Sequence, residues 1–160
     1  METPLSIERY SGDFADLLDL LQMSMGLESR AGVQHLLAVE KARGTRYYVA
    51  TRSGQLIGLV GVWFDPTGAV TELEPPQVID LAVLPAHRRQ GVASALIELA
   101  VHETQAAGFG RLWLYTNGND IGVLTFYRKL GFRLAAVVPD WFGEGSVKAI
   151  LRLDFEVETD

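Results

Sequence analysis

The sequence contains no cysteine, and this absence excludes disulfide bonds, thiolate nucleophiles and cysteine-ligated metal sites. Histidine is scarce too, because the chain has only His35, His87 and His102, and their spacing does not match a zinc-binding helix motif. A Gly-x-Ser-x-Gly nucleophile elbow is also missing. We therefore predict no metal site, no thiol chemistry and no covalent enzyme intermediate.

Long apolar runs are lacking as well. The longest uncharged stretch, Ser53 to Phe64, is shorter than the roughly 18 residues of a membrane helix, and glycine and serine interrupt it. The first residues, Met1 to Pro4, show no basic segment followed by an apolar one. These features predict a cytoplasmic protein with no membrane partner.

Basic residues are in the minority. The 20 acidic and 14 basic residues give a formal charge of −6, which repels a nucleic-acid backbone, so we expect no nucleic-acid partner. The one dense basic cluster, His87-Arg88-Arg89, is too short for a polybasic tract but well sized for one small polyanion. Charge therefore favours a phosphorylated small molecule as the ligand.

The 160 residues, 48% of them hydrophobic, predict one domain over residues 1–160 with a sizeable core. Apolar periodicity and turn residues predict an α/β chain with the element order β-α-α-β-β-β-α-β-α-β-β. The predicted strands are Leu5–Tyr10, Tyr47–Thr51, Gln55–Phe64, Val78–Leu84, Arg111–Thr116, Phe132–Val138 and Ser146–Phe155. The predicted helices are Asp13–Met25 with Asp13 as N-cap, Val33–Ala42, Ser94–Ala107 and Ile121–Leu130, and Asp65–Pro76 is a predicted loop.

The most informative segment is Arg88-Arg89-Gln90-Gly91-Val92-Ala93, between the apolar strand Val78–Leu84 and the helical run from Ser94. Gly91 lets the backbone approach an anion, and the start of a helix presents free N–H groups to the same point. Two arginines add charge-assisted donors. The segment predicts a pyrophosphate-binding loop, although on its own it also fits an ordinary strand-to-helix turn with solvated arginines.

Two motifs carry a resemblance to a known family. Arg88, Gly91 and Ala93 match a loop of Arg or Gln, two residues, Gly, one residue, then Gly or Ala; downstream, Tyr127, Gly131 and Phe132 match Tyr-x-x-x-Gly-Phe. With this element order, the chain resembles the Gcn5-related N-acetyltransferase (GNAT) family over essentially its whole length. The resemblance implies an α+β fold with a central mixed, mostly antiparallel sheet of about seven strands and four flanking helices, and acetyl-CoA as co-substrate.

The match has departures. The family often has Asn seven residues before this Tyr and Ala four before it, where this chain has Asp120 and Val123, with Asn119 one place earlier. In the related ribosomal-protein N-terminal acetyltransferases, a Glu near the end of the strand before this helix serves the acceptor amine. That position is Tyr115 here, which weighs against a ribosomal-protein acceptor.

The resemblance assigns the cofactor mainly to backbone groups. The N–H groups of Arg89 to Ser94 would hold the pyrophosphate, the strand end Leu81 to Val83 would pair with the pantetheine amides, and an N–H near Val83 would stabilise the oxyanion. The expected cofactor-binding residues are Leu81, Ala82, Val83, Arg88, Arg89, Gln90, Gly91, Val92, Ala93, Ser94, Asn119 and Tyr127.

Tyr127 and Asp80 are the predicted catalytic residues. Tyr127 shares a helix face with Val123 and Leu130, which alone is a core pattern, but the resemblance makes it the proton donor to the departing thiolate. Asp80 is a carboxylate in an otherwise apolar strand; burial would raise its pKa and suit it to accept a proton from an ammonium acceptor or to bind that ammonium. A structural carboxylate paired with a neighbouring element is the alternative for Asp80.

Other candidates lie on loops. Glu72 and Glu74 are reserve candidates for the base, and a solvated loop is their plainer interpretation. Trp141, Phe142 and Glu144 lie on the predicted 139–145 loop, where an aromatic pair beside a carboxylate could receive a cationic amine. Anchoring of the hairpin and a dimer contact are the alternatives there.

The sequence thus predicts an acetyl-CoA-dependent N-acetyltransferase that works by direct attack of an amine. The acidic balance favours a small cationic amine as acceptor. One alternative is acetylation of a protein N-terminus or lysine, which needs an open groove between the Gly26–Gly32 and Pro139–Gly145 loops. Another is a non-catalytic acyl-CoA-binding or sensing domain. Dimers are common in the family, so a homodimer is expected by analogy alone.

Overall fold

The computed structural model describes residues 3–25, 30–64 and 76–157. Its strands are β1 (Leu5–Arg9), β2 (Arg46–Arg52), β3 (Gln55–Trp63), β4 (Gln77–Val83), β5 (Arg111–Asn117), β6 (Arg133–Pro139) and β7 (Val147–Asp154). Its α-helices are α1 (Leu18–Met25), α2 (Arg30–Ala42), α3 (Val92–Ala106) and α4 (Ile121–Lys129). Short 3-10 helices cover Phe14–Leu17 and Pro85–His87. The predicted element order and α/β class are confirmed.

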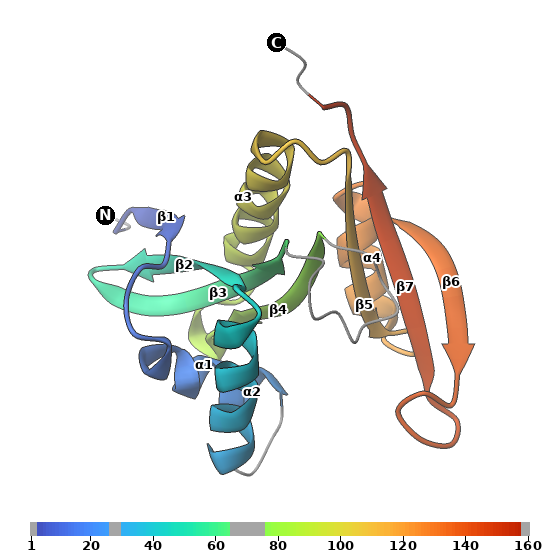
Figure 1. Ribbon diagram of the computed structural model, residues 1–160, viewed down its shortest axis with the longest axis horizontal. Coiled ribbons are helices and arrows are strands. Elements are labelled where there is room, and N and C mark those ends of the chain that lie inside the picture. Colours follow the sequence, from blue (N-terminus) through green and yellow to red (C-terminus); the bar gives the residue numbers. More distant parts are fainter. Residues whose placement is uncertain (1–2, 26–29, 65–75, 158–160) are drawn as a thin grey trace.

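The strands form one seven-stranded sheet in the order β1-β2-β3-β4-β5-β7-β6. Every pairing is antiparallel except that of β4 with β5, which is parallel, so the sheet is mixed and mostly antiparallel as expected. The parallel contact has a single registered residue pair, Gln77 with Trp113. Beyond that pair the two strands separate, and Figure 1 shows β1–β4 on one side of the gap and β5–β7 on the other.

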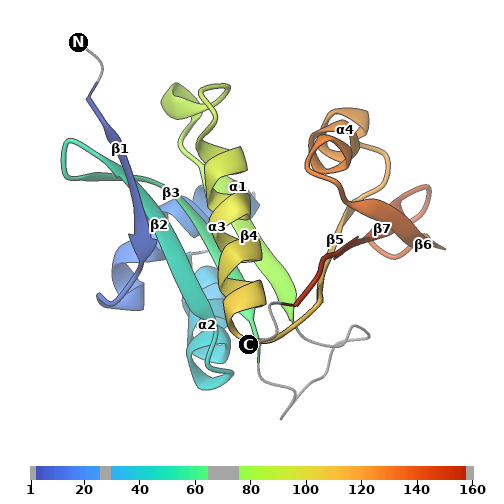
Figure 2. The ribbon, with the colours of Figure 1, turned by 90° about the horizontal axis from the view of Figure 1, so that it is seen from above.

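Helices cover both faces of the sheet (Figure 2). On one face α1 and α2 pack on β2, β3 and β4 through a core that includes Leu17, Leu21, Leu37 and Tyr47. On the other face α3 and α4 pack through a second core; its buried members include Leu96, Ile97, Ala100, Leu112, Tyr127 and Phe132. The gap between β4 and β5 therefore lies between two separately packed layers, and it is open toward both.

Element boundaries differ from prediction where a cap or turn decides them. Asp13 is the predicted N-cap, and its Oδ1 accepts from the Ala15 N–H at 2.9 Å, but the first turn is 3-10 rather than α-helical. Helix α2 begins three residues earlier than predicted, at Arg30. Helix α3 begins two residues earlier, at Val92, because Gly91 takes the left-handed conformation that starts it. Most of the predicted Asp65–Pro76 loop, with Glu72 and Glu74, lies outside the described residues, as does most of the predicted Gly26–Gly32 loop.

Among the described helices, none has the length and apolar character needed to cross a bilayer.

Candidate active site

The divergence of β4 from β5 leaves backbone groups of β4 without a strand partner. Leu84 N–H donates to the carbonyl of Ile57 in β3 at 2.8 Å. Because N–H groups alternate along a strand, those of Val83 and Leu81 point the other way, into the gap toward β5. An extended ligand could therefore pair with β4 at this edge as an added strand would.

A groove of about 630 Å³ occupies this gap on the α3–α4 side. Residues predicted to bind the cofactor line much of it, and they come from β4, the following loop and two helices. They are Leu81, Ala82, Val83, Arg88, Arg89, Ala93 and Tyr127, joined by Thr116, Gly122, Val123 and Phe126. The structure thus brings together residues that are more than 40 positions apart in the sequence.

The loop before α3 has the backbone geometry of an anion-binding turn. Arg89 and Gly91 both have positive φ, 60° and 81°, so successive N–H groups turn toward one side. Gly91 is the N-cap of α3, and no described side chain caps that helix start. The first-turn N–H groups therefore remain available to a ligand, next to a hollow of about 270 Å³ that Arg88, Gly91 and Ser94 help to line.

Side chains of this loop brace it from behind. The Arg88 Nε donates to the Val83 carbonyl at 3.0 Å, which ties the loop to the end of β4. The Gln90 amide donates to the Ala86 carbonyl at 3.3 Å and accepts from Arg52 of β2 at 2.6 Å. The Gln90 side chain is thus engaged within the protein, and its backbone N–H is the group that this loop presents to a ligand.

Tyr127 on α4 lines the groove and is 7% exposed. Its ring packs edge-on against Phe126 and Phe132, with centroids 5.0 and 5.6 Å away, which fixes its orientation. Burial raises the pKa of the Tyr127 hydroxyl to about 12. The phenol therefore stays protonated at neutral pH and can donate a proton or hydrogen bond into the groove.

Asn119 lies at the turn before α4, but its amide donates to the Gly145 carbonyl at 3.1 Å, and it is not among the residues that line the groove. Asp120 provides the helix cap instead, since its Oδ1 accepts from the Val123 N–H at 3.1 Å. The place of Asn119 in cofactor binding stays a prediction.

A second hollow, a cavity of about 140 Å³, lies on the α1–α2 face at the same gap. Asp80 lines it, and the Tyr47 hydroxyl of β2 donates to Asp80 Oδ2 at 2.9 Å. Its other lining residues are Leu21, Val33, Leu36, Leu37, Glu40, Arg43, Gln77, Ile79 and Tyr115. Since Asp80 and Leu81 are consecutive in β4, and Tyr115 and Thr116 in β5, the groove and the cavity adjoin at the gap.

A β-bulge aims Asp80 into this cavity. The register of β4 on β3 shifts, so that Gly61 faces Asp80 and Val62 faces Val78, which leaves Ile79 as an extra residue. Ile79 and Asp80 consequently both line the cavity, although neighbouring strand residues ordinarily face opposite sides.

Gly61 makes room for the hydrogen bond between Tyr47 and Asp80. It lies in β3 between them, paired with Tyr47 on one side and with Asp80 on the other. A Cβ at Gly61 would lie 2.8 Å from the Tyr47 ring and 3.0 Å from the Ile79 side chain. The missing side chain lets the phenol cross β3 to reach the carboxylate.

The environment of Asp80 favours its protonated form. Burial raises the pKa of the Asp80 carboxyl to about 6, the hydrogen bond from Tyr47 opposes this rise, and the charge of Glu40 adds to it. The pKa of Tyr47 is raised far above its usual value, first by burial and then by the Asp80 charge, so Tyr47 remains a donor. A carboxyl that titrates near neutral pH is suited to general-base work.

The 140–146 turn carries the predicted aromatic pair. Trp141 and Phe142 are both about half exposed, and Phe142 packs against Tyr115 of β5 with ring centroids 6.5 Å apart. The Lys148 ammonium lies 3.9 Å from the Trp141 ring centroid and 4.3 Å from that of Tyr115. The Trp141 and Tyr115 rings thus already contact a cation of the chain itself. Glu144, in the same turn as Trp141, is exposed.

Sequence reasoning missed Tyr47, Arg43 and Gln77, which all line the cavity. Tyr47 is the first residue of a predicted strand, Gln77 directly precedes the predicted strand Val78–Leu84, and Arg43 follows a helix, where a basic residue is ordinary. A glycine inside the predicted strand Gln55–Phe64 was the available signal for Tyr47, because such a glycine often marks a close approach. Within residues 3–25, 30–64 and 76–157 no acidic or histidine cluster forms a metal site.

The chain is similar to known acetyltransferases. A family model described as the Acetyltransferase (GNAT) family matches residues 14–132. Rat N-acetyltransferase 8B is 33% identical over 97 residues, which are 57% of this chain and 40% of the rat protein. The [ribosomal protein bS18]-alanine N-acetyltransferase of Escherichia coli K12 is 29% identical over 76 residues, 46% of this chain and 51% of that protein. The matches thus span about half or less of these curated relatives.

Solved structures share the fold. The E. coli ribosomal-protein-S18-alanine N-acetyltransferase superposes with a TM-score of 0.78 at 18% identity, over 98% of this chain and 97% of the other. An aminoglycoside 6'-N-acetyltransferase complexed with coenzyme A gives 0.78 at 16% identity, over 97% and 99%. A Bacillus subtilis acetyltransferase in complex with CoA gives 0.77 at 21% identity, over 96% and 100%.

Proposed function

The chain belongs to the acetyltransferase (GNAT) family, and on that premise we propose that it transfers the acetyl group of acetyl-CoA to an amine. The observation that carries the proposal is the single backbone pair between β4 and β5, beyond which the strands diverge around a groove. Three kinds of group lie at that groove: the uncapped start of α3, the strand N–H groups of β4 that have no partner, and the buried phenol of Tyr127. Coenzyme A complexes of proteins with this fold support the choice of donor.

The donor would be held by backbone groups. The N–H groups from Arg89 to Ser94 would bind the pyrophosphate, with Arg88 and Arg89 adding charge. The N–H groups of Leu81 and Val83 would pair with the pantetheine arm. Acetyl-CoA would supply a thioester carbonyl at the gap, where the N–H of Val83 is the oxyanion donor of the proposal.

Two side chains would move the protons. Asp80 would take a proton from the ammonium of the acceptor, so that the amine attacks the thioester carbon as the C–N bond forms and the C–S bond breaks. Tyr127 would donate its proton to the departing thiolate from the other face of the sheet. The nitrogen would lose its second proton to solvent as the amide forms, and the Tyr127 phenolate, with a pKa of about 12, would take a proton back from water. Both groups meet the pKa requirements, because Asp80 titrates near 6 and the pKa of Tyr127 is about 12.

A small acceptor is favoured over a large one. The cavity beside Asp80 has a volume of about 140 Å³, below the roughly 300–1,000 Å³ of pockets that hold drug-sized ligands. A protein N-terminus is the second candidate, and it is supported by the E. coli relative named for a ribosomal-protein alanine. Tyr115 lines the acceptor cavity, and an aromatic side chain there offers no carboxylate for that amine.

Binding and turnover test the proposal separately. Acetyl-CoA should raise the melting temperature of the purified protein, and thiol release should then follow on addition of small amines but not of alanine-initiated peptides. Release with the peptides alone would favour the second candidate. Stabilisation by acetyl-CoA without thiol release from any acceptor would favour a non-catalytic acyl-CoA-binding domain.

A further inference from the structure

Two residues that line the acceptor cavity, and a third next to one of them, have buried polar atoms without hydrogen-bond partners. Within the described chain, Arg43 Nε and Nη2, Gln77 Oε1 and Trp63 Nε1 are all buried and unpaired. Gln77 is 1% exposed and Trp63 is 0% exposed. Arg43 and Gln77 both line the cavity, and Trp63 faces Gln77 across the β3–β4 ladder. Leaving such groups unsatisfied is costly, so their presence here calls for a partner.

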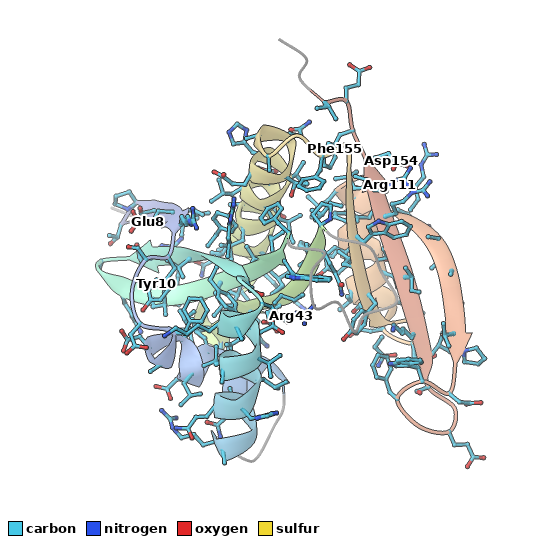
Figure 3. The ribbon with its side chains drawn as sticks, in the orientation of Figure 1. Glu8, Tyr10, Arg43, Arg111, Asp154 and Phe155 are labelled. Atoms are coloured by element: carbon cyan, nitrogen blue, oxygen red, sulfur yellow. The ribbon has the colours of Figure 1, made fainter. Side chains whose placement is uncertain are left out.

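The Arg43 guanidinium is held in one orientation. Its Nη1 donates to Glu40 Oε1 at 3.2 Å, and its plane lies over the Trp63 ring, 4.3 Å from the centroid. Glu40 is fixed in turn, because its Oε2 accepts from the Thr45 hydroxyl at 2.6 Å. Figure 3 shows Arg43 where the end of α2 meets the sheet. The side chain is therefore pre-organised rather than free to swing into solvent.

The unpaired edge of Arg43 has the geometry of a carboxylate site. Glu40 uses only Nη1, so the Nε–H and the Nη2–H remain unpaired, and these two form one edge of the planar guanidinium. Both atoms are closed to solvent in this structure, so a carboxylate reaches this edge only if the cavity wall opens beside it. Such an edge binds a carboxylate through two parallel hydrogen bonds. Gln77 Oε1 is also unpaired. Because it is a hydrogen-bond acceptor, it cannot bind a carboxylate oxygen, but it can accept a hydrogen bond from a donor group of the ligand.

The same cavity is lined by the group that would receive an amine. This group is Asp80, which accepts a hydrogen bond from Tyr47. The apolar part of the lining consists of Leu21, Val33, Leu36, Leu37 and Ile79. The cavity thus offers a cationic anchor, an apolar wall and a proton acceptor within about 140 Å³.

From this arrangement we infer that the acceptor is a small amino acid with an apolar body, whose carboxylate binds the Nε–Nη2 edge of Arg43 while its amine lies at Asp80. The inference rests on the proposed acetyl transfer and names its acceptor class. It replaces a purely cationic amine, because a simple amine would leave the Arg43 edge unpaired. Arg43 is then a residue that determines specificity rather than one that moves protons.

Three acceptors of the same shape test the carboxylate: L-leucine, L-leucinamide and 3-methylbutylamine. We expect thiol release with kcat/KM about 10- to 100-fold higher for leucine than for either of the others, the range of a lost charge-assisted pair. Arg43→Lys keeps the charge but loses the two parallel N–H donors, so the preference for leucine over leucinamide should shrink, through a higher KM for leucine. Equal use of all three acceptors by the wild-type protein would overturn the inference and leave acetyl transfer intact.

Arg46→Lys is the matched control. Arg46 also stacks on an aromatic ring, 4.7 Å from the Phe64 centroid, but it does not line the cavity. Its acceptor preference should equal that of the wild type. A comparable loss in both variants would assign the effect to the fold and would contradict a carboxylate at Arg43.

A binding measurement decides the point without turnover. N-acetyl-L-leucine has the carboxylate but no reactive amine. N-acetyl-L-leucinamide has neither the carboxylate nor a reactive amine. Calorimetric titration of the wild-type protein should detect the first at least about tenfold more tightly than the second, and Arg43→Lys should remove the difference. Equal or absent binding of the two would overturn the carboxylate site, even if thiol release fails and acetyl transfer is rejected on its own evidence.

Discussion

The groove proposed for the donor and the cavity proposed for the acceptor adjoin at one gap, yet they are built from different parts of the polypeptide. On the proposed donor side, main-chain N–H groups of β4 and of the loop before α3 point toward the groove, and the loop side chains Arg88 and Gln90 largely brace the loop. On the acceptor side, the polar groups are side chains from distant elements, Arg43, Tyr47 and Asp80 among them.

This difference is consistent with one fold carrying unlike acceptor sites. A backbone site needs a glycine and a helix start, so it survives most changes of sequence. A side-chain site changes with each substitution. Two structures that superpose here with TM-scores of 0.78 are named for a ribosomal-protein alanine and for an aminoglycoside, and each is under 20% identical to this chain.

Asp80→Asn should break the acceptor side with the largest effect. We expect kcat to fall about 100- to 1,000-fold at pH 8, the scale of a lost general base. In the wild type, activity should rise with pH through about 6 as the Asp80 carboxyl ionises. Asn has no such titration, so the pH–rate profile of the variant should lose that limb; a retained limb would remove Asp80 from the mechanism.

The same variant should gain stability. Because the folded pKa of Asp80, about 6, exceeds its ordinary value of 3.8, its stabilising contribution is present at low pH and is lost as pH rises through 6. At pH 8 the free energy of unfolding of Asp80→Asn should therefore exceed that of the wild type by up to about 3 kcal/mol, and near pH 3 to 4 the two should be equal. Denaturant unfolding at both pH values measures this difference.

Tyr127→Phe should affect chemistry without affecting donor affinity. We expect kcat to fall about 100-fold because the departing thiolate loses its proton donor, with little change in KM for acetyl-CoA. Tyr48→Phe is the control, since the Tyr48 hydroxyl is also buried and Tyr48 is not among the residues that line the groove. If both variants turn over normally, the assignment of Tyr127 is wrong.

Gly91→Ala should weaken the donor side specifically. Alanine at the φ of 81° costs about 1–2 kcal/mol, so the loop relaxes away from its anion-binding form and acetyl-CoA affinity should fall about tenfold. Gly108→Ala is matched to it, with a φ of 91° and open space around the missing Cβ, but at the far end of α3. Calorimetry should show lost affinity for the first variant alone.

Gln90→Ala should have the smallest effect, although Gln90 belongs to the motif. Its side chain bonds Arg52 and Ala86, so the variant should lose about 1 kcal/mol of stability and change KM for acetyl-CoA less than about threefold. A change comparable to that of Gly91→Ala would show that donor binding uses side chains after all.

The same contrast governs what the sequence could predict. Gly91 and the helix after it are adjacent in sequence, and Asp80 is conspicuous in an apolar strand, so the sequence makes both of them candidates. The bond from Tyr47 to Asp80 depends on the extra residue Ile79 and on the space above Gly61, and strand periodicity encodes neither. Arg43 resembled an ordinary helix-end cation until Trp63 and Gln77 were placed beside it.

The single rung between Gln77 and Trp113 has a consequence for the motions of the protein. With so little ladder between β4 and β5, amides that face the gap should exchange hydrogen faster than those inside either half of the sheet, although one core packs against both halves. A ligand that pairs with β4 in the gap would protect these amides. Slower exchange at the gap would then report donor binding.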